Sequence, residues 1–248
     1  MTTSNASYGV IGGTGLDSLP EFELIASHQI DTPYGVPSAP VQEGLVAGCG
    51  VYFMPRHGTE HHLPPHQINY RANIWALKSL GVSQLIALFA VGGITESMRP
   101  GHLVLPDQLI DYTWGREHTF DEGTNGPLMH VEFTEPYSKI LRQALIEAAI
   151  SCQLPHHTHA TYGATQGPRL ETAAEIQRLL RDGCDLVGMT GMPEAALARE
   201  AGLAYAGVCM VVNAAAGVGD EPITLDAIRD TLTAEVAAVR LLLQAFFS

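Results

Sequence analysis

The chain has 248 residues, of which 46% are hydrophobic and 16% charged, and its formal net charge is −13. This size and composition predict a single globular domain over residues 1–248. The acidic balance, with lysine only at Lys78 and Lys139, argues against a nucleic-acid partner. Any anion site must be local and preorganised, which favours a small ligand in a pocket over a polymer.

No stretch of the chain predicts a membrane span or a disulfide framework. Runs of about 18 apolar residues are missing, and residues 1–7 lack the basic and then apolar plan of a signal peptide, so we expect a cytoplasmic protein. The four cysteines are widely separated, without a CxxC pair. They are therefore expected to be buried thiols, with neither a zinc site nor a redox pair.

Short apolar runs alternate with amphipathic stretches along the chain. The apolar runs predict strands at Tyr8–Ile11, Val51–Pro55, Leu85–Ala90, Leu103–Leu105, Thr158–Tyr162, Leu186–Gly188 and Tyr205–Val212. The amphipathic stretches predict helices at Asn69–Leu80, Tyr137–Ile150, Glu171–Arg181, Pro193–Glu200 and Leu225–Phe246. Gly81 and Gly183 follow two of these helices, as is typical of a helix C-terminus. The alternation predicts an α/β fold with a mixed sheet.

Groups suited to an anion follow several of the predicted strands. Thr14 lies in a glycine turn after the first strand, Arg56-His57 follows the second, and Met189-Thr190 follows Leu186–Gly188. Together they offer backbone N–H groups, hydroxyls, a guanidinium and an imidazole, which suit phosphate. A dinucleotide fingerprint is the rival interpretation, but Ser18 replaces the third glycine of GxGxxG.

Histidines cluster between the second strand and the first long helix, at positions 57, 61, 62 and 66. A metal site is one interpretation, but Pro64-Pro65 breaks any helix there and HExxH is absent. We expect instead a histidine-lined loop, including His61, near a substrate.

Two polar residues suit a purine base. Glu171 is either a helix-start acid favoured by the helix dipole or an acceptor for a ring N–H. Asn213 is either a strand-end turn residue or an amide that bonds a base edge. Because neither GxSxG nor a reactive cysteine pattern is present, the bound anion itself is the expected attacking group.

Five motifs follow one another along the chain: Ile11-Gly12-Gly13-Thr14-Gly15, Pro55-Arg56-His57-Gly58, residues 69–77, Gly167-Pro168-Arg169 and residues 189–194. In these motifs the chain resembles the trimeric purine nucleoside phosphorylase and methylthioadenosine phosphorylase family. This resemblance implies a mixed, partly barrel-like sheet flanked by helices, and a homotrimer with active sites near subunit interfaces. It also implies inorganic phosphate as co-substrate, with no metal and no organic cofactor.

The resemblance also assigns roles by position. The phosphate-binding positions correspond to Thr14, Arg56, His57, Thr190 and the backbone N–H of Ala90. Met189 corresponds to the residue against the ribose, and Asn213 to the residue near N7 of the purine.

Two departures from the family pattern bear on the phosphate and on the base. Phe89 stands where many relatives carry a small polar residue. Asn213-Ala214-Ala215 replaces the Asp-x-Asp of adenine-specific members, whereas Glu171 resembles the acid that binds N1–H of 6-oxopurines. A carboxylate at N1 repels the bare N1 of adenine, and an unpaired buried partner costs about 1–3 kcal/mol.

At the 5′ end of the sugar, Leu225 replaces a histidine of ordinary purine nucleoside phosphorylases. An apolar side chain suits a methylthio group and leaves a hydroxyl unpaired. We therefore predict phosphorolysis of S-methyl-5′-thioinosine to hypoxanthine and 5-methylthioribose 1-phosphate. The alternatives are a general 6-oxopurine nucleoside phosphorylase, a 5′-methylthioadenosine phosphorylase, and a non-catalytic nucleotide-binding or NAD-binding protein.

Overall fold

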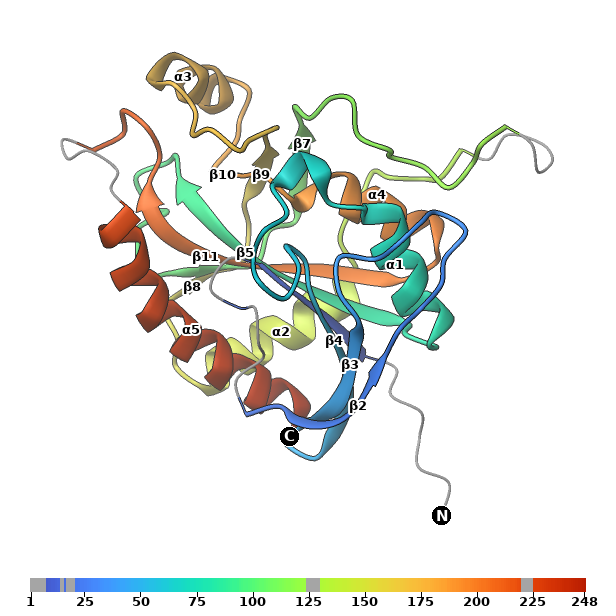
Figure 1. Cartoon of the computed structure of the whole chain (residues 1–248). Coiled ribbons are helices and arrows are strands. Elements are labelled where there is room, and N and C mark those ends of the chain that lie inside the picture. Colours follow the sequence, from blue (N-terminus) through green and yellow to red (C-terminus); the bar gives the residue numbers. More distant parts are fainter. Residues whose placement is uncertain (1–7, 14–15, 17–20, 124–129, 220–224) are drawn as a thin grey trace.

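The computed structural model describes residues 8–13, 16, 21–123, 130–219 and 225–248. Its strands are β1 (Tyr8–Gly12), β2 (Glu23–His28), β3 (Val41–Val46), β4 (Cys49–Pro55), β5 (Gln84–Gly93), β6 (Leu103–Val104), β7 (Gln108–Asp111), β8 (His156–His157), β9 (Thr161–Ala164), β10 (Leu186–Gly188) and β11 (Ala204–Ala214). Its helices are the short 3-10 helix η1 (Pro65–Gln67), α1 (Tyr70–Ser79), α2 (Lys139–Ser151), α3 (Ala173–Arg181), α4 (Gly191–Glu200) and α5 (Leu225–Phe247). The described strands form one mixed sheet with helices on both faces, which confirms the predicted fold class (Figure 1).

The sheet branches at its central strand, β5. β11 pairs with β5 in parallel over nearly the whole length of both strands. On the other edge, β1 pairs in parallel with β5 only as far as Ala87, and β10 then pairs antiparallel with Gly92 and Gly93. Residues 88–91 lie between these two partners, so their main-chain groups on this edge are available to a side chain or a ligand.

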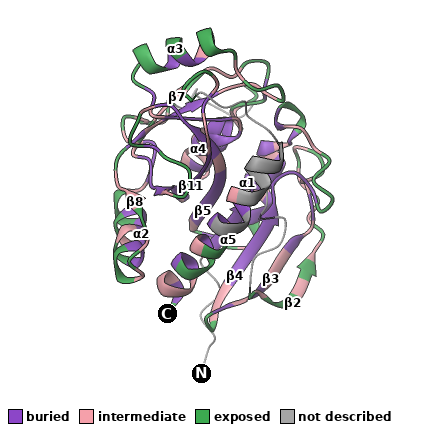
Figure 2. Ribbon diagram, turned by 90° about the vertical axis from the view of Figure 1, so that its left-hand side faces the viewer, coloured by how far each residue is buried: buried purple, intermediate pink, exposed green. Residues whose placement is uncertain are grey.

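Alternate side chains of β5 enter two different cores. Leu85, Ala87 and Phe89 pack with residues of α1 and α4 on one face of the sheet. Ile86 and Leu88 pack with residues of α2 and α5 on the other. This is the two-residue period of a strand buried on both faces. Figure 2 shows the buried residues concentrated in the central strands, whereas the outer side of α3 is exposed.

Most predicted elements are confirmed within a few residues, but two predictions are wrong. The strand expected at Thr158–Tyr162 is replaced by the short β8 and by β9, which begins at Thr161. Glu171 does not open a helix: α3 begins at Ala173, after the N-cap Thr172, whose hydroxyl and Glu175 form a capping box. The glycines expected to end helices are confirmed, since Gly81 and Gly183 have φ of +88° and +93°.

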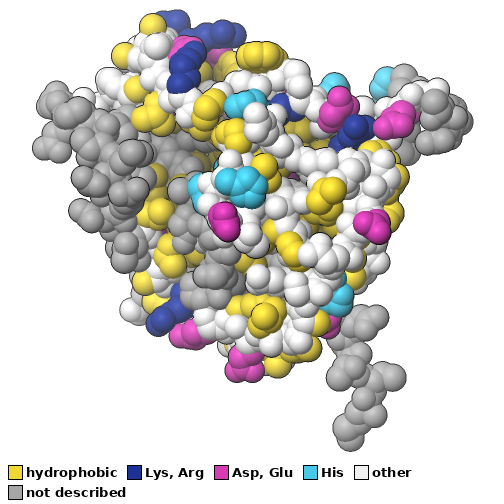
Figure 3. All heavy atoms as spheres, viewed as in Figure 1, with side chains coloured by type: hydrophobic (Ala, Val, Ile, Leu, Met, Phe, Trp, Pro, Cys, Tyr) yellow, Lys and Arg dark blue, Asp and Glu magenta, His cyan; other side chains and the backbone are white. Residues whose placement is uncertain are grey.

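The surface carries few basic side chains. On the face in Figure 3 they gather mainly around α3, and histidine side chains lie near the middle of that face. No described helix has the length and apolar character needed to cross a membrane. The expectation of four buried thiols is half wrong, because Cys184 and Cys209 are buried whereas Cys49 and Cys152 are partly exposed.

Candidate active site

A cavity of about 240 Å³ lies beside residues 88–91 of β5, where the sheet branches. It is lined by eight residues that the sequence singles out: Arg56, His57, Ala90, Glu171, Met189, Thr190, Asn213 and Ala215. Segments that are far apart in the chain therefore converge on one site. The other lining residues are mostly small or apolar: Gly13, Pro65, Phe89, Val91, Gly92, Leu170, Val187, Gly188, Val212 and Ala216.

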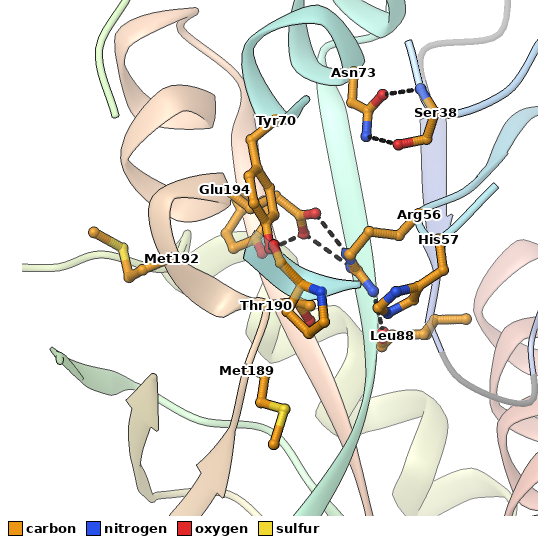
Figure 4. Close-up of polar contacts among 12 residues, drawn as sticks. Ser38, Arg56, His57, Tyr70, Asn73, Leu88, Met189, Thr190, Met192 and Glu194 are labelled. Carbon is orange, nitrogen blue, oxygen red and sulfur yellow. Dashed lines mark hydrogen bonds and ion pairs between the residues drawn. The ribbon is translucent and has the colours of Figure 1, made fainter. Parts of the chain in front are cut away.

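Arg56 is held rigidly at one end of the cavity. It follows β4 and is fully buried. Its Nε and Nη2 donate to the two carboxylate oxygens of Glu194, at 2.7 and 2.9 Å, and its Nη1 donates to the carbonyl of Leu88 at 3.0 Å (Figure 4). A guanidinium has five N–H groups, so two of them remain for a ligand.

Glu194 is the essential partner of this arginine. Its carboxylate is buried and also accepts a hydrogen bond from the Tyr205 hydroxyl at 2.8 Å. Burial alone would lower the pKa of Arg56, but the attraction of Glu194 outweighs burial and raises it. The guanidinium is therefore charged at all working pH values, and its charge is largely balanced from behind.

Phe89 supports the same guanidinium from the side. The guanidinium carbon of Arg56 lies 4.8 Å from the centre of the Phe89 ring, within the range of a cation–π contact. The aromatic ring at this position thus stabilises the arginine, where a small polar residue would offer a hydroxyl to the ligand.

Glycine is required where the chain passes this pair. A Cβ on Gly13 would lie 2.9 Å from Nη1 of Arg56 and 2.8 Å from the Leu88 carbonyl oxygen. The main chain of the glycine turn therefore approaches the anion end of the cavity more closely than any other residue type allows.

The backbone N–H of Ala90 points toward the same end. Alternate residues of a strand direct their main-chain groups to the same edge. Because the carbonyl of Leu88 faces Arg56 on the edge that β1 has left, the N–H of Ala90 faces that edge too. It is a fixed donor in the cavity wall.

His57 and Thr190 complete this end of the cavity. Nδ1 of His57 lies 2.8 Å from the carbonyl oxygen of Leu63, so it carries the proton and donates. Thr190 precedes α4, and its side chain makes no capping hydrogen bond to that helix. Both side chains are buried yet line the cavity.

Glu171 stands at the other end of the cavity, in the loop between β9 and α3. The hydroxyl of Thr165 donates to its Oε1 at 2.6 Å. The second carboxylate oxygen is then free to accept a hydrogen bond from a ligand, and the hydroxyl fixes the orientation of the carboxylate.

Asn213 is turned toward the cavity by a β-bulge. The pairing of β11 with β5 shifts by one residue between Val211 and Asn213, which brings Asn213 opposite Gly92. Its side-chain nitrogen donates to the carbonyl of Ala214 at 2.7 Å. Because a carbonyl can only accept, the amide nitrogen must face it, and Oδ1 is left as a free acceptor.

Not every predicted site residue is placed at the cavity. Ala214 does not line it and instead accepts the hydrogen bond from Asn213. His61 is also absent from the wall, although its ring centre lies 4.5 Å from that of His57. Thr14 and the side chain of Leu225 lie outside the described residues. Among the residues that the structure describes, no group of three or more His, Cys, Asp or Glu could hold a metal ion.

Sequence reasoning did not assign roles to Glu194 and Thr165. Glu194 stands in the quoted stretch 189–194, but its partner Arg56 is 138 positions away, so no local pattern connects them. Thr165 follows β9 and precedes Glu171 by six positions. In a loop, a separation of six residues does not predict that two side chains are in contact.

Comparisons with known proteins show the family of the chain. Residues 7–248 match the family model described as phosphorylase superfamily. A Xanthomonas campestris protein named probable S-methyl-5′-thioinosine phosphorylase is 54% identical over 220 residues, covering 89% of this chain and 88% of that protein. The 6-oxopurine nucleoside phosphorylase of Pyrococcus furiosus is 46% identical over 220 residues, covering 87% and 82%.

A solved structure shows the same fold. Methylthioadenosine phosphorylase from Schistosoma mansoni, in complex with adenine, superposes with a TM-score of 0.92 at 33% identity, over 98% of this chain and 91% of that one. The family model matches nearly the whole chain. The solved structure and the relatives from Xanthomonas campestris and Pyrococcus furiosus support this match. The chain belongs to the phosphorylase superfamily.

Proposed function

We propose that the protein cleaves S-methyl-5′-thioinosine with inorganic phosphate, giving hypoxanthine and 5-methylthioribose 1-phosphate. The observation that carries this proposal is the two-ended cavity, with Arg56 and His57 at one end and the oriented Glu171 carboxylate at the other. The names of the relatives from Xanthomonas campestris and Pyrococcus furiosus support a 6-oxopurine nucleoside as substrate.

The phosphate occupies the end formed by Arg56, His57, Thr190 and the N–H of Ala90, with Thr14 as a further donor. Charge-assisted hydrogen bonds from a guanidinium are the strongest available to a phosphate oxygen. Because Glu194 balances the charge of Arg56, most of the selectivity comes from the directions of these donors. A net charge of −13 repels anions at a distance, so a preformed cluster of donors is needed.

The base occupies the end formed by Glu171 and Asn213. The free carboxylate oxygen of Glu171 accepts N1–H of hypoxanthine, whereas adenine has no proton at N1. The alanines that follow Asn213 present no carboxylate to an exocyclic amine. Glu171 is half-buried in the free cavity, and leaving its second oxygen unpaired beneath a bound base costs about 1–3 kcal/mol, which disfavours adenine nucleosides about 5- to 150-fold.

The reaction breaks the C1′–N9 bond and forms a C1′–O bond to phosphate. The purine leaves with the electron pair, and positive charge develops at C1′, where the adjacent phosphate stabilises it and then bonds to it. As N7 takes up a proton from solvent, Oδ1 of Asn213 accepts a hydrogen bond from the new N–H. Met189 packs against the ribose, and the family resemblance assigns Leu225 to the 5′-methylthio group. The reaction needs no metal and no organic cofactor.

We further propose that the enzyme is a cytoplasmic homotrimer with active sites near the subunit interfaces. This assignment rests on the resemblance of the whole chain to the trimeric family.

The decisive experiment compares release of hypoxanthine from methylthioinosine and inosine, and of adenine from methylthioadenosine and adenosine, with and without phosphate. We expect strictly phosphate-dependent release, fastest from methylthioinosine. Faster cleavage of inosine would identify a general 6-oxopurine nucleoside phosphorylase. Faster cleavage of methylthioadenosine would refute the role of Glu171 as the acceptor of N1–H. If no base is released from any of the four nucleosides, the protein is a non-catalytic binding protein.

Asn213→Ala is expected to lower kcat about a hundredfold while changing the KM for nucleoside less than threefold. The reason is that the amide acts on a proton that reaches N7 only as the base leaves, so its loss affects the transition state more than the ground state. Steady-state kinetics at saturating phosphate provide the measurement. Equal effects on kcat/KM and on the dissociation constant of hypoxanthine would contradict a leaving-group role.

A further inference from the structure

Arg116 is a buried arginine that holds together two loops of the candidate site without lining the cavity. It lies between β7 and α2, in a segment to which sequence analysis assigns no element, and is only 9% exposed. Its five N–H groups donate to six oxygens on three other parts of the chain, since Nη1 shares its two N–H groups among three acceptors. It is not among the residues that line the cavity.

The acceptors belong to both ends of the site. At the base end, Nη2 donates to the carbonyls of Thr165 and Gln166, at 3.3 and 2.9 Å, and Nε donates to the Gln166 side chain at 3.2 Å. At the opposite end, Nη1 donates to the carbonyls of Met189 and Met192, at 2.9 and 2.5 Å. These two carbonyls flank Thr190, and Thr165 is the residue that orients Glu171.

The arginine is itself fixed from both sides. Nη1 also donates to the Tyr70 hydroxyl at 3.1 Å. The residues that follow Arg116 contact two helices. Arg71 of α1 forms ion pairs with Glu117 and Glu122. Glu200 of α4 accepts hydrogen bonds from the hydroxyl of Thr119 and the N–H of Phe120. These contacts fix the position of the guanidinium relative to α1 and α4.

All six acceptors are neutral oxygens, so no carboxylate among these partners balances the buried charge. For the stability of the fold, burying a cation in this way is unfavourable compared with burying an apolar side chain of the same size. We therefore look for the role of Arg116 in the directions of its hydrogen bonds. Only a planar guanidinium can reach four carbonyls in two loops at once, because a lysine ammonium has a single nitrogen and three N–H groups.

We propose that Arg116 is a positioning residue that sets the distance between the Glu171 carboxylate and the Met189–Thr190 pair, and so the fit of the nucleoside between them. The inference rests on the proposed function of the site. Among the proposed phosphate-binding residues Arg56, His57, Ala90 and Thr190, Thr190 alone stands next to these bonds, because Arg56 and His57 follow β4 and Ala90 belongs to β5. Loss of Arg116 should therefore impair recognition of the nucleoside more than that of phosphate.

The test is Arg116→Lys, with Arg142→Lys as the matched control. Arg142 is equally buried and also donates to two main-chain carbonyls, those of Leu105 and Thr158, but it lies on α2 away from the cavity. For Arg116→Lys we expect kcat/KM for the nucleoside to fall at least tenfold and the preference for methylthioinosine over methylthioadenosine to narrow at least threefold. The KM for phosphate should stay within threefold, and Arg142→Lys should leave all three values within twofold.

A general loss of stability would instead lower kcat/KM equally for methylthioinosine and methylthioadenosine, or would change the kinetics of Arg116→Lys and Arg142→Lys to the same extent. Either result overturns the proposal. If Arg116→Lys does not fold, the same measurements are made on Arg116→Gln, which keeps a neutral donor. Calorimetric binding of hypoxanthine gives a readout that does not depend on turnover. Failure of the proposed function shows in the wild-type enzyme as absent base release, whereas failure of this inference shows only as unchanged ratios between variant and wild type.

Discussion

Replacing Arg56 with methionine is expected to raise the KM for phosphate at least a hundredfold, which corresponds to about 2.7 kcal/mol of lost interaction. The variant loses the only guanidinium in the cavity wall formed by the described residues, and hydrogen bonds to charged groups contribute about 1.5–3 kcal/mol each. Steady-state kinetics with varied phosphate at saturating nucleoside give the value directly.

The same variant also leaves Glu194 buried with only the Tyr205 hydroxyl as partner. Breaking a buried pair in this way destabilises a protein by about 3–5 kcal/mol. The double variant Arg56→Met/Glu194→Leu removes both charges, so denaturant unfolding should show recovery of most of that stability. Phosphate binding should not recover. If the double variant regains a normal KM for phosphate, the defect of the single variant was one of folding.

Glu171→Gln is expected to reverse the choice of base. With the Thr165 hydroxyl still donating to the amide oxygen, the new NH₂ group faces N1, where it opposes N1–H of hypoxanthine and matches the bare N1 of adenine. We expect kcat/KM for methylthioinosine to fall about 10- to 100-fold. The ratio of kcat/KM for methylthioinosine to that for methylthioadenosine should drop by at least tenfold, because N1–H of hypoxanthine and the new NH₂ group would both be left without an acceptor.

Glu175→Gln is the control for this experiment. Glu175 lies four positions further on, pairs with Arg169 at the surface and does not line the cavity. Glutamine at this position preserves the capping box of α3. A change of base preference in the control as large as in Glu171→Gln would mean that the loop, and not the carboxylate at N1, determines specificity.

Regular elements with a strong hydrophobic period could be predicted from the sequence. The apolar run of β5, buried on both faces, and the amphipathic stretches of α1 and α2 carry this signal. The edge strand β2 could not be found because four of its six residues are exposed and its pattern is weak. For α3 the signal was present but overlooked: Thr172 and Glu175 have the spacing of a capping box, which places the helix start after Glu171.

The site was predictable where a polar residue stands at or just after the end of a strand and lines the cavity, as Arg56, Thr190 and Asn213 do. It was not predictable where residues act on each other over long separations. The bond from Arg116 to Met189 spans 73 positions, and that from Arg56 to Glu194 spans 138. Such contacts follow from the topology of the sheet, which no local pattern encodes.

The bidentate grip of Glu194 on Arg56 has a consequence for affinity. A surface arginine samples many rotamers and loses them when an anion arrives, at about 0.5–1.5 kcal/mol for each side chain that becomes immobilised. Here that loss of conformational entropy takes place when the chain folds. An arriving anion would meet a guanidinium that already has its final orientation, so binding would lose no further entropy in ordering this side chain.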